Sequence, residues 1–269
     1  MLGSDLGACA ANRGLGVQIY DLPEFDITDE EQVKDTVSQS EVIVNCAAYT
    51  NVEKAESEVG LANQVNGYAV GRLGRIAKEA KIPVLHISTD FVFDGTQTGA
   101  YTEADAANPI SVYGGSKLLG EKLLQESGCQ CCIVRVQWTY GKNGLNFITK
   151  ILDAAKDRDE LRVVDDQVGS PTHTAEVAKV LCDLLQMKSF PTGLYHCAAS
   201  GYVSRYEMVR YVFDCLGNET PVIPCKTADF KTVAKRPLNS RFDCGKLETL
   251  LGRTIPTWQE MLENYLETL

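Results

Sequence analysis

The stretch EVIVNCAAY, residues 41–49, decides the fold class of this chain. It contains a near-continuous run of β-branched residues, which is typical of a strand buried on both faces of a parallel sheet. Residues 58–80 then have the pattern of one long helix, and KIPVLHISTD (81–90) is the next predicted strand. A strand, a helix and a second strand predict a parallel pair joined by a right-handed crossover.

The same alternation continues in both directions. Toward the C-terminus, residues 111–126 predict a helix and CCIVRVQW (131–138) a further buried strand. Toward the N-terminus, residues 29–38 predict a helix that starts at an Asp cap, and VQIYDL (17–22) predicts another strand. The chain is therefore predicted to be an α/β protein with a Rossmann-type, doubly wound parallel sheet.

After residue 140 the alternation becomes less regular. The expected elements are helices at 146–157, 174–186 and 204–216, a last helix from 257, and extended segments at 161–167 and 193–199. We predict a Rossmann domain over residues 1–141. Residues 142–269 are predicted to form mainly a smaller substrate-binding lobe, with about 161–200 returning to the Rossmann domain.

The N-terminal residues depart from the usual start of a dinucleotide-binding fold. Such a fold begins with an apolar strand that runs into a glycine-rich turn. This chain begins MLGSDLGACAANRG, which has the pattern of the first helix. We therefore expect an N-terminally truncated Rossmann domain without the first strand and most of the glycine-rich turn. A truncated product with no function of its own is one interpretation of this start.

Composition and charge exclude several classes of function. The formal net charge is −10 and no run of Lys and Arg occurs, which argues against binding to nucleic acid or to an anionic membrane. No apolar stretch reaches the roughly 18 residues of a membrane span, and the N-terminus has no signal-peptide pattern, so the cytoplasm is the expected compartment. The cysteines and histidines form no metal-site or Ser/His/Asp pattern, so no metal site is predicted.

Tyr113 and Lys117 carry the chemistry expected of a reductase. They lie in YGGSK, one helical turn apart, so both side chains share one helix face. A lysine ammonium beside a phenol favours the phenolate, and the phenol can donate its proton to a developing alkoxide. Thr89 ends the preceding strand, where ligands bind in open parallel sheets, and its hydroxyl could bind a ketone. A cap or turn role is the alternative for Thr89.

Further residues could lie beside a dinucleotide. Ala47 and Ala48 are small and follow a strand, so they would let a cofactor approach the backbone, although a tightly packed turn is equally compatible. Asp21 ends a predicted strand, where an acid can bind the adenosine ribose and disfavour a 2′-phosphate. Asp26 and Ile27 follow in a turn and could flank the adenine.

The chain resembles the dTDP-4-dehydrorhamnose reductase family of extended short-chain dehydrogenases along essentially its whole length. The resemblance rests on these runs, in the family's order and spacing: VNCAAYTNVEKAE (44–56), STDFVFDG (88–95), NPISVYGGSKLLGE (108–121), VRVQWTYG (134–141), VDDQVGSPT (164–172), GLYHCAASG (193–201) and KRPLNSRFDCGKL (235–247). Two departures are Phe91, where the family has Tyr, and Gly3, which alone represents the glycine-rich turn.

The resemblance implies hydride transfer from NADPH or NADH to the C4 ketone of dTDP-4-dehydro-L-rhamnose, giving dTDP-L-rhamnose. It implies that Tyr113 is the acid, that Thr89 binds the ketone, and that Lys117 modifies the pKa of Tyr113 and binds the nicotinamide ribose. The residues implied at the cofactor are Gly3, Asp21, Asp26, Ile27, Asn45, Ala47, Ala48, Tyr49, Tyr113 and Lys117. Those implied at the substrate are Thr50, Val52, Phe91, Trp138, Arg236 and Asn239, of which Arg236 and Asn239 would help to hold the nucleotide diphosphate. A Mg²⁺ ion and a homodimer are compatible with the resemblance.

Two further alternatives stay open. One is a non-catalytic partner protein that resembles the regulatory beta subunit of methionine adenosyltransferase, which keeps this fold. The other is a sibling enzyme that acts on a different nucleotide-deoxysugar, as a reductase or an epimerase.

Overall fold

The central sheet of the computed structural model, which describes residues 1–269, has four parallel strands. In spatial order they are β1 (Ile43–Asn45), β2 (Val84–Thr89), β3 (Cys131–Val136) and β8 (Gly193–Cys197). The register pairs Thr89 with Val136 at the carboxyl ends of β2 and β3. The predicted parallel α/β sheet is thus confirmed.

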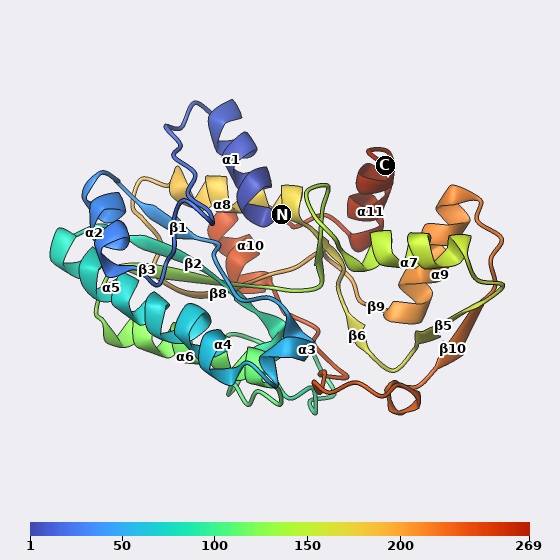
Figure 1. Cartoon of the computed structure of the whole chain (residues 1–269). Coiled ribbons are helices and arrows are strands. Elements are labelled where there is room, and N and C mark those ends of the chain that lie inside the picture. Colours follow the sequence, from blue (N-terminus) through green and yellow to red (C-terminus); the bar gives the residue numbers. More distant parts are fainter.

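Helices cover both faces of this sheet (Figure 1). One face carries α2 (Glu30–Ser38), α5 (Ala69–Ala80) and α6 (Val112–Glu126), together with α4 (Val59–Asn63) and a π-helical turn (Gln64–Tyr68) that leads into α5. The opposite face carries α1 (Leu2–Asn12), α8 (Thr174–Leu185) and α10 (Gly245–Leu251). The three layers match the doubly wound arrangement expected from the sequence.

Alternation along the strands divides the core in two. Leu85 of β2 and Val134 of β3 belong to the larger apolar cluster, with residues of α1 and α8. Val84 and Ile133 belong to a second cluster with residues of α5. The two sets point to opposite sides because successive side chains of a strand alternate between its faces.

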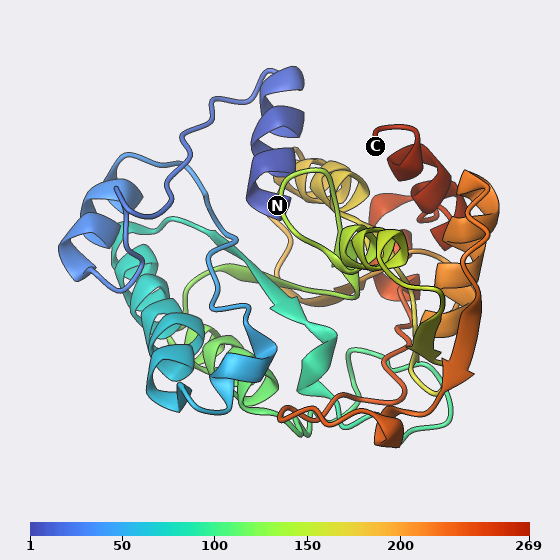
Figure 2. The same ribbon diagram turned by 45° about the vertical axis from the view of Figure 1, so that its right-hand side comes forward.

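The rest of the chain forms a second lobe beside the sheet (Figure 2). Its small parallel sheet joins β5 (Leu161–Val164) to β10 (Val222–Cys225), and its helices are α7 (Phe147–Lys156), α9 (Arg205–Leu216) and α11 (Trp258–Leu266). Short pairings link β4 (Thr139–Tyr140) to β7 (Thr172–His173) and β6 (Val168–Gly169) to β9 (Val203–Ser204). None of the helices combines the length and the apolar character needed to cross a membrane.

Three predicted helix starts agree closely with the sequence, and each of these has a capping side chain. The Asp29 carboxylate accepts hydrogen bonds from the backbone N–H groups of Glu31 and Gln32 at the start of α2. Ser111 caps α6 through the N–H of Gly114, and Ser204 caps α9 in a reciprocal arrangement with Glu207. Each cap satisfies a donor that the first helical turn leaves free.

The predicted strand at 17–22 is wrong. These residues form no strand, and the Ile19 and Leu22 side chains are 66% and 67% exposed. The segment pairs with no strand of the central sheet, in which β1 is an edge strand bonded only to β2, so it takes part in no hydrogen-bond ladder. Apolar character alone therefore does not make it a strand.

Candidate active site

Tyr113 and Lys117 are brought to the carboxyl end of β2 by the close packing of α6. A Cβ atom at Gly114 would overlap the backbone carbonyl of Phe91, so only glycine allows α6 to approach the 3₁₀ turn Asp90–Val92 this closely. The Phe91 and Tyr113 rings meet edge to face, with centroids 5.4 Å apart. Tyr113 consequently lies beside Thr89, the last residue of β2.

Thr89 and Tyr113 form the polar end of this arrangement. Thr89 is 6% exposed, and its hydroxyl accepts a hydrogen bond from the backbone N–H of Phe91 at 3.2 Å. Burial raises the pKa of Tyr113 to about 12, while the Thr89 hydroxyl opposes this and the negative charge of Asp90 adds to it. The expectation that Lys117 lowers this pKa is not met in the chain alone, and the phenol stays protonated at neutral pH.

Lys117 is buried and held by the backbone of β2. Its Nζ donates a hydrogen bond to the carbonyl oxygen of Ile87 at 2.7 Å and lies 3.5 Å from Nε2 of His86. Burial lowers the pKa of Lys117 to about 8, and the negative charge of Glu121 acts in the opposite direction. The ammonium therefore has a fixed position between α6 and β2.

A buried ion pair lies next to these residues. The Arg135 guanidinium of β3 donates to both oxygens of Glu121, at 2.9 and 2.7 Å, and the Ser88 hydroxyl donates to the same carboxylate. Glu121 is one helical turn beyond Lys117 on α6, and Ser88 precedes Thr89 on β2. The pair thus connects two strands to the helix that carries the predicted acid.

Residues at the carboxyl end of β1 are arranged to leave the backbone accessible. The Asn45 side chain accepts a hydrogen bond from the Ala47 N–H at 3.0 Å, and its Nδ2 lies 3.1 Å from Nδ1 of His86. Ala47 is exposed. The Tyr49 N–H donates to Asn66 at 2.8 Å, which holds the loop against the helical segment that follows it.

The N-terminus of α1 points to the same edge of the sheet. A Cβ at Gly3 would lie 3.7 Å from that of Cys46, directly after β1, and no side chain caps the first turn of α1. Free backbone N–H groups at a helix N-terminus attract phosphate oxygens. Together with the exposed backbone at Ala47, these groups fit a dinucleotide whose pyrophosphate lies at α1.

The residues expected at the adenosine are less clearly placed. Asp21 is exposed in a segment that is not a strand, and its carboxylate accepts from the neighbouring Leu22 N–H at 2.9 Å. Asp26 accepts from the Thr28 N–H at 2.8 Å. Ile27 is 8% exposed and belongs to the core cluster under α5, so its side chain serves packing.

Trp138 is the most constrained residue expected at the substrate. Its backbone φ is +42°, a conformation that is strained for a bulky residue. A Cβ at Gly169 would lie 2.7 Å from the indole, and the Arg205 guanidinium lies 3.5 Å from the centroid of the ring. The indole is therefore enclosed between β6 and the start of α9.

Thr50, Val52 and Arg236 lie around α3 (Val52–Ala55). Thr50 is exposed and Val52 half-buried at the start of this helix. Arg236 forms an ion pair with Glu53 of α3, with Nη2 and Oε1 2.6 Å apart. The guanidinium is thus linked to the loop after β1, on the side where a substrate diphosphate was expected.

Asn239 differs from the expectation that it binds the diphosphate. Its Nδ2 donates to the carbonyl oxygens of Gln97 and Gly99, at 2.6 and 2.7 Å, and its Oδ1 accepts from the backbone and side chain of Arg241. These bonds use the hydrogen-bonding capacity of the amide. Asn239 therefore fixes the 97–99 loop in this structure.

Sequence reasoning missed several residues of the site. His86 is fully buried, and it contacts both Asn45 and Lys117. Asp90 is 3% exposed beside Thr89, and Arg205 covers Trp138. The run Ser88-Thr89-Asp90 could have indicated Asp90, whereas no local signal indicated Arg205.

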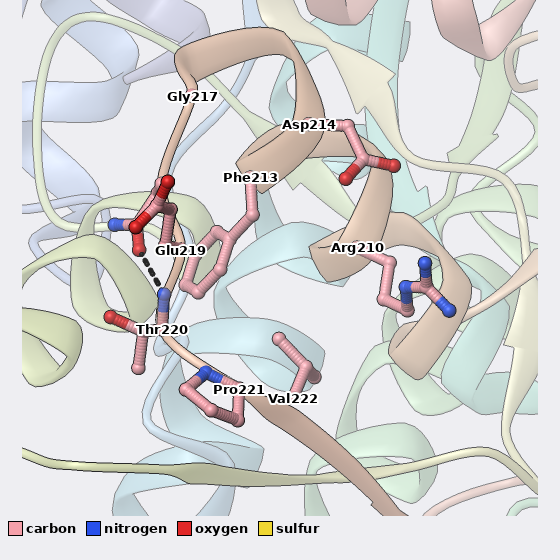
Figure 3. Close-up of a pocket in the computed structure, with 9 residues that line it drawn as sticks. Arg210, Phe213, Asp214, Gly217, Glu219, Thr220, Pro221 and Val222 are labelled. Carbon is pink, nitrogen blue, oxygen red and sulfur yellow. Dashed lines mark hydrogen bonds between the residues drawn. The ribbon is translucent and has the colours of Figure 1, made fainter.

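One pocket lies elsewhere, at the C-terminal end of α9 and the loop before β10 (Figure 3). Phe213 and Val222 line it together with polar residues, and the Thr220 N–H donates to Asn218 at its rim. None of the predicted site residues lines this pocket. Nowhere in the chain do three His, Cys, Asp or Glu residues group closely enough to hold a metal ion.

A doubly wound sheet with a Tyr–Lys pair beside a strand-end threonine defines a reductase of the short-chain dehydrogenase type. Comparison with known proteins gives the family. The chain belongs to the family described as RmlD substrate binding domain, whose model matches residues 1–269.

Named relatives agree with this family. The chain is 38% identical to a dTDP-4-dehydrorhamnose reductase of Aggregatibacter actinomycetemcomitans over 98% of this chain and 94% of that protein. It is 36% identical to the Escherichia coli K12 protein of the same name, over 91% and 85% of the two chains. A dTDP-4-dehydrorhamnose reductase of Bacillus anthracis, solved with NADP, superposes with a TM-score of 0.94 at 32% identity, covering 100% of this chain and 95% of that chain.

Proposed function

We propose that this chain is a dTDP-4-dehydrorhamnose reductase, which reduces the C4 ketone of dTDP-4-dehydro-L-rhamnose to give dTDP-L-rhamnose with NADPH or NADH. The observation that carries the proposal is the meeting of Thr89, Tyr113 and Lys117 at the carboxyl edge of the sheet. The relatives named for this activity match the chain over nearly its full length.

The geometry of these three side chains supports the catalytic roles that we propose for them. The bound cofactor supplies the hydride. Tyr113 holds a proton at neutral pH and gives it to the oxygen that becomes the new hydroxyl, while Thr89 donates a hydrogen bond to the same oxygen. Lys117, held by the Ile87 carbonyl, would use a remaining N–H donor to bind the nicotinamide ribose.

The remaining assignments are part of the same proposal. Asn45, Ala47, Ala48 and Tyr49 would line the cofactor, with its pyrophosphate at Gly3 and its adenosine toward Asp21, Asp26 and Ile27. Thr50, Val52, Phe91, Trp138 and Arg236 would contact the nucleotide sugar. Assembly as a homodimer and location in the cytoplasm remain predictions, to be measured by light scattering and cell fractionation.

The domain division is also proposed. The position of β8 in the large sheet, and of α8 against α1, supports the return of part of the C-terminal region to the Rossmann domain. β5 does not take part in this return, since it pairs with β10 in the small sheet. The returning segment is therefore shorter than residues 161–200.

The test is a reductase assay with a defined product. Purified chain is given dTDP-4-dehydro-L-rhamnose with NADPH or NADH, cofactor oxidation is followed by absorbance, and the sugar product is identified by NMR. Oxidation with formation of dTDP-L-rhamnose supports the proposal. A folded chain that binds cofactor but leaves the ketone intact would favour the partner-protein alternative, and turnover of another 4-keto sugar nucleotide would favour the sibling enzyme.

A further inference from the structure

His86 is a buried imidazole that lies between two hydrogen-bond donors. It is the third residue of β2 and is fully buried. Its Nδ1 lies 3.1 Å from Nδ2 of Asn45, and its Nε2 lies 3.5 Å from Nζ of Lys117. Burial holds the pKa of His86 well below its usual range, and the charge of Lys117 acts in the same direction. The ring is therefore neutral and carries a single N–H.

The Asn45 amide determines which ring nitrogen carries this hydrogen. The backbone N–H of Ala47 can only donate, and its nitrogen lies 3.0 Å from Oδ1 of Asn45. This bond turns the amide oxygen toward Ala47 and the amide nitrogen toward His86. Because an amide nitrogen can only donate, Nδ1 of His86 must accept, and the ring hydrogen is on Nε2.

The Nε2–H group of His86 then faces the side-chain nitrogen of Lys117. An ammonium has three donors and no acceptor, whereas a neutral amine has a lone pair that can accept from Nε2–H. Lys117 donates to the carbonyl oxygen of Ile87 at 2.7 Å, which a neutral amine can also do. The 3.5 Å contact is long for a hydrogen bond, so the imidazole acts mainly through the direction of its dipole, which a buried site screens little.

We propose that Asn45 and His86 are positioning residues for Lys117: Asn45 fixes the Nε2–H form of the imidazole, and this N–H favours the neutral amine of the lysine. The inference rests on the proposed function, in which Tyr113 gives its proton to the substrate. A charged lysine stabilises the phenolate that remains after this transfer, and a neutral lysine does not. His86 therefore limits the pH range over which Lys117 supports the reaction.

Two other titratable groups act on Lys117. Burial raises the pKa of the Cys46 thiol, in the loop after β1, to about 11, so this thiol is neutral at pH 7. Glu121, one turn further along α6, favours the charged lysine, but both of its oxygens are bonded to Arg135 of β3. Neither group forms a hydrogen bond with Lys117. The imidazole of His86 is therefore the titratable group in direct contact with its Nζ.

The position of the hydrogen on His86 can be measured directly. Long-range 1H–15N correlation spectra of chain labelled with 15N-histidine distinguish the two neutral forms of each ring, and the chain has three histidines. The His86 signals are those that disappear in His86→Gln. We expect the Nε2–H form in wild type at pH 7. The Nδ1–H form, or a charged ring, would overturn the inference.

Two variants test the effect on Lys117, whose titration is followed by NMR of lysine labelled with 13C at Cε. Asn45→Asp offers a carboxylate oxygen to Nδ1, which moves the ring hydrogen to Nδ1 and presents a bare Nε2 to the ammonium. His86→Gln can turn an amide oxygen toward the ammonium without added charge. We expect the midpoint for Lys117 to rise from about 8 by at least about one pH unit in Asn45→Asp, and to rise also in His86→Gln. Asn51→Asp is the control, because this exposed cap of α3 adds the same charge away from His86.

The outcomes separate this inference from the proposed function. A rise in Asn45→Asp alone would be an effect of charge and would overturn the inference, as would no rise in either variant. In the reductase assay, the fall of kcat on the basic side should move to higher pH in both variants, because the lysine stays charged further, and a fixed profile would overturn the role in the reaction. If the proposed function itself fails, wild type oxidises no NADPH with dTDP-4-dehydro-L-rhamnose, whereas the His86 and Lys117 signals can still be measured.

Discussion

The Nζ of Lys117 lies 2.7 Å from the carbonyl oxygen of Ile87, two residues before Thr89 on β2. This bond ties the helix that carries Tyr113 to the strand that carries Thr89. It also keeps an ammonium group almost fully out of water, which is unfavourable for its charged form. Burial of Lys117 in the site therefore lowers the free energy of unfolding of the chain.

We predict that Lys117→Met raises the free energy of unfolding above that of wild type, and that this increase is larger at pH 7 than at pH 10. The pKa of Lys117 falls from 10.5 to about 8 on folding. Because the pKa is lower in the folded state, the lysine does not destabilise the fold above pH 10.5, and this stability is lost as the pH falls through 8. At pH 7 the lysine is charged in both states, and its burial lowers the free energy of unfolding. The advantage of the variant should shrink by about 2–3 kcal/mol between the two pH values.

Denaturant unfolding at both pH values measures this difference. Lys122→Met is the matched control, because Lys122 is exposed on the same helix and should show no such dependence. An equal difference at pH 7 and pH 10 would show that Lys117 is not desolvated as the structure indicates.

Tyr113→Phe should abolish most of the turnover while leaving the fold intact. The variant keeps the edge-to-face contact with Phe91 and loses only the hydroxyl that carries the proton. Loss of a general acid lowers turnover by about 10²-fold or more. Steady-state turnover, cofactor affinity and the melting temperature should be measured together. Tyr68→Phe, at a 53% exposed position, is the control, and near-normal turnover in Tyr113→Phe would refute the acid role.

The fold was predictable wherever a local signal acts alone. Caps such as Asp29 and Ser111 fix helix starts, and the apolar run at 131–136 fixes β3. The segment 17–22 was not predictable in this way, because an apolar run becomes a strand only beside a partner, and this segment pairs with no strand. The π turn at Gln64–Tyr68 likewise has no sequence signal that separates it from α5.

The residues of the site also differ in whether a local sequence signal predicts their position. Tyr113 and Lys117 share a helix face, so their spacing predicts their proximity. Arg205 reaches Trp138 only through the packing of the second lobe on the sheet, which no local pattern contains. The raised pKa of Tyr113 also escaped prediction, because it depends on burial and on Asp90 and not on the spacing to Lys117.

Glu121→Gln should destabilise the chain by about 3–5 kcal/mol, since it leaves the buried Arg135 guanidinium without its counter-charge. Both side chains are 4% exposed, and Ser88 donates to the same carboxylate. Asp153→Asn is the control, because its ion pair with Lys156 is 66–72% exposed and should matter by less than about 0.5 kcal/mol. Urea unfolding of both variants decides this, and similar small effects would mean that Arg135 finds another partner.

Gly114→Ala should lower the stability of the chain and Gly115→Ala should raise it, although the two glycines are adjacent on α6. A Cβ at position 114 would overlap the Phe91 carbonyl, so α6 must move away from the end of β2 and take Tyr113 away from Thr89. We expect a loss of about 1–3 kcal/mol and a fall in turnover on the order of 10²-fold. A Cβ at position 115 meets nothing within 4 Å. There alanine should stabilise the helix by about 0.5–1 kcal/mol and leave turnover within about twofold. Thermal unfolding and turnover should be measured for both variants. A difference between them would show that the close contact of Gly114 with Phe91 sets the distance between Tyr113 and Thr89. Equal stability and turnover would show that this contact does not set that distance.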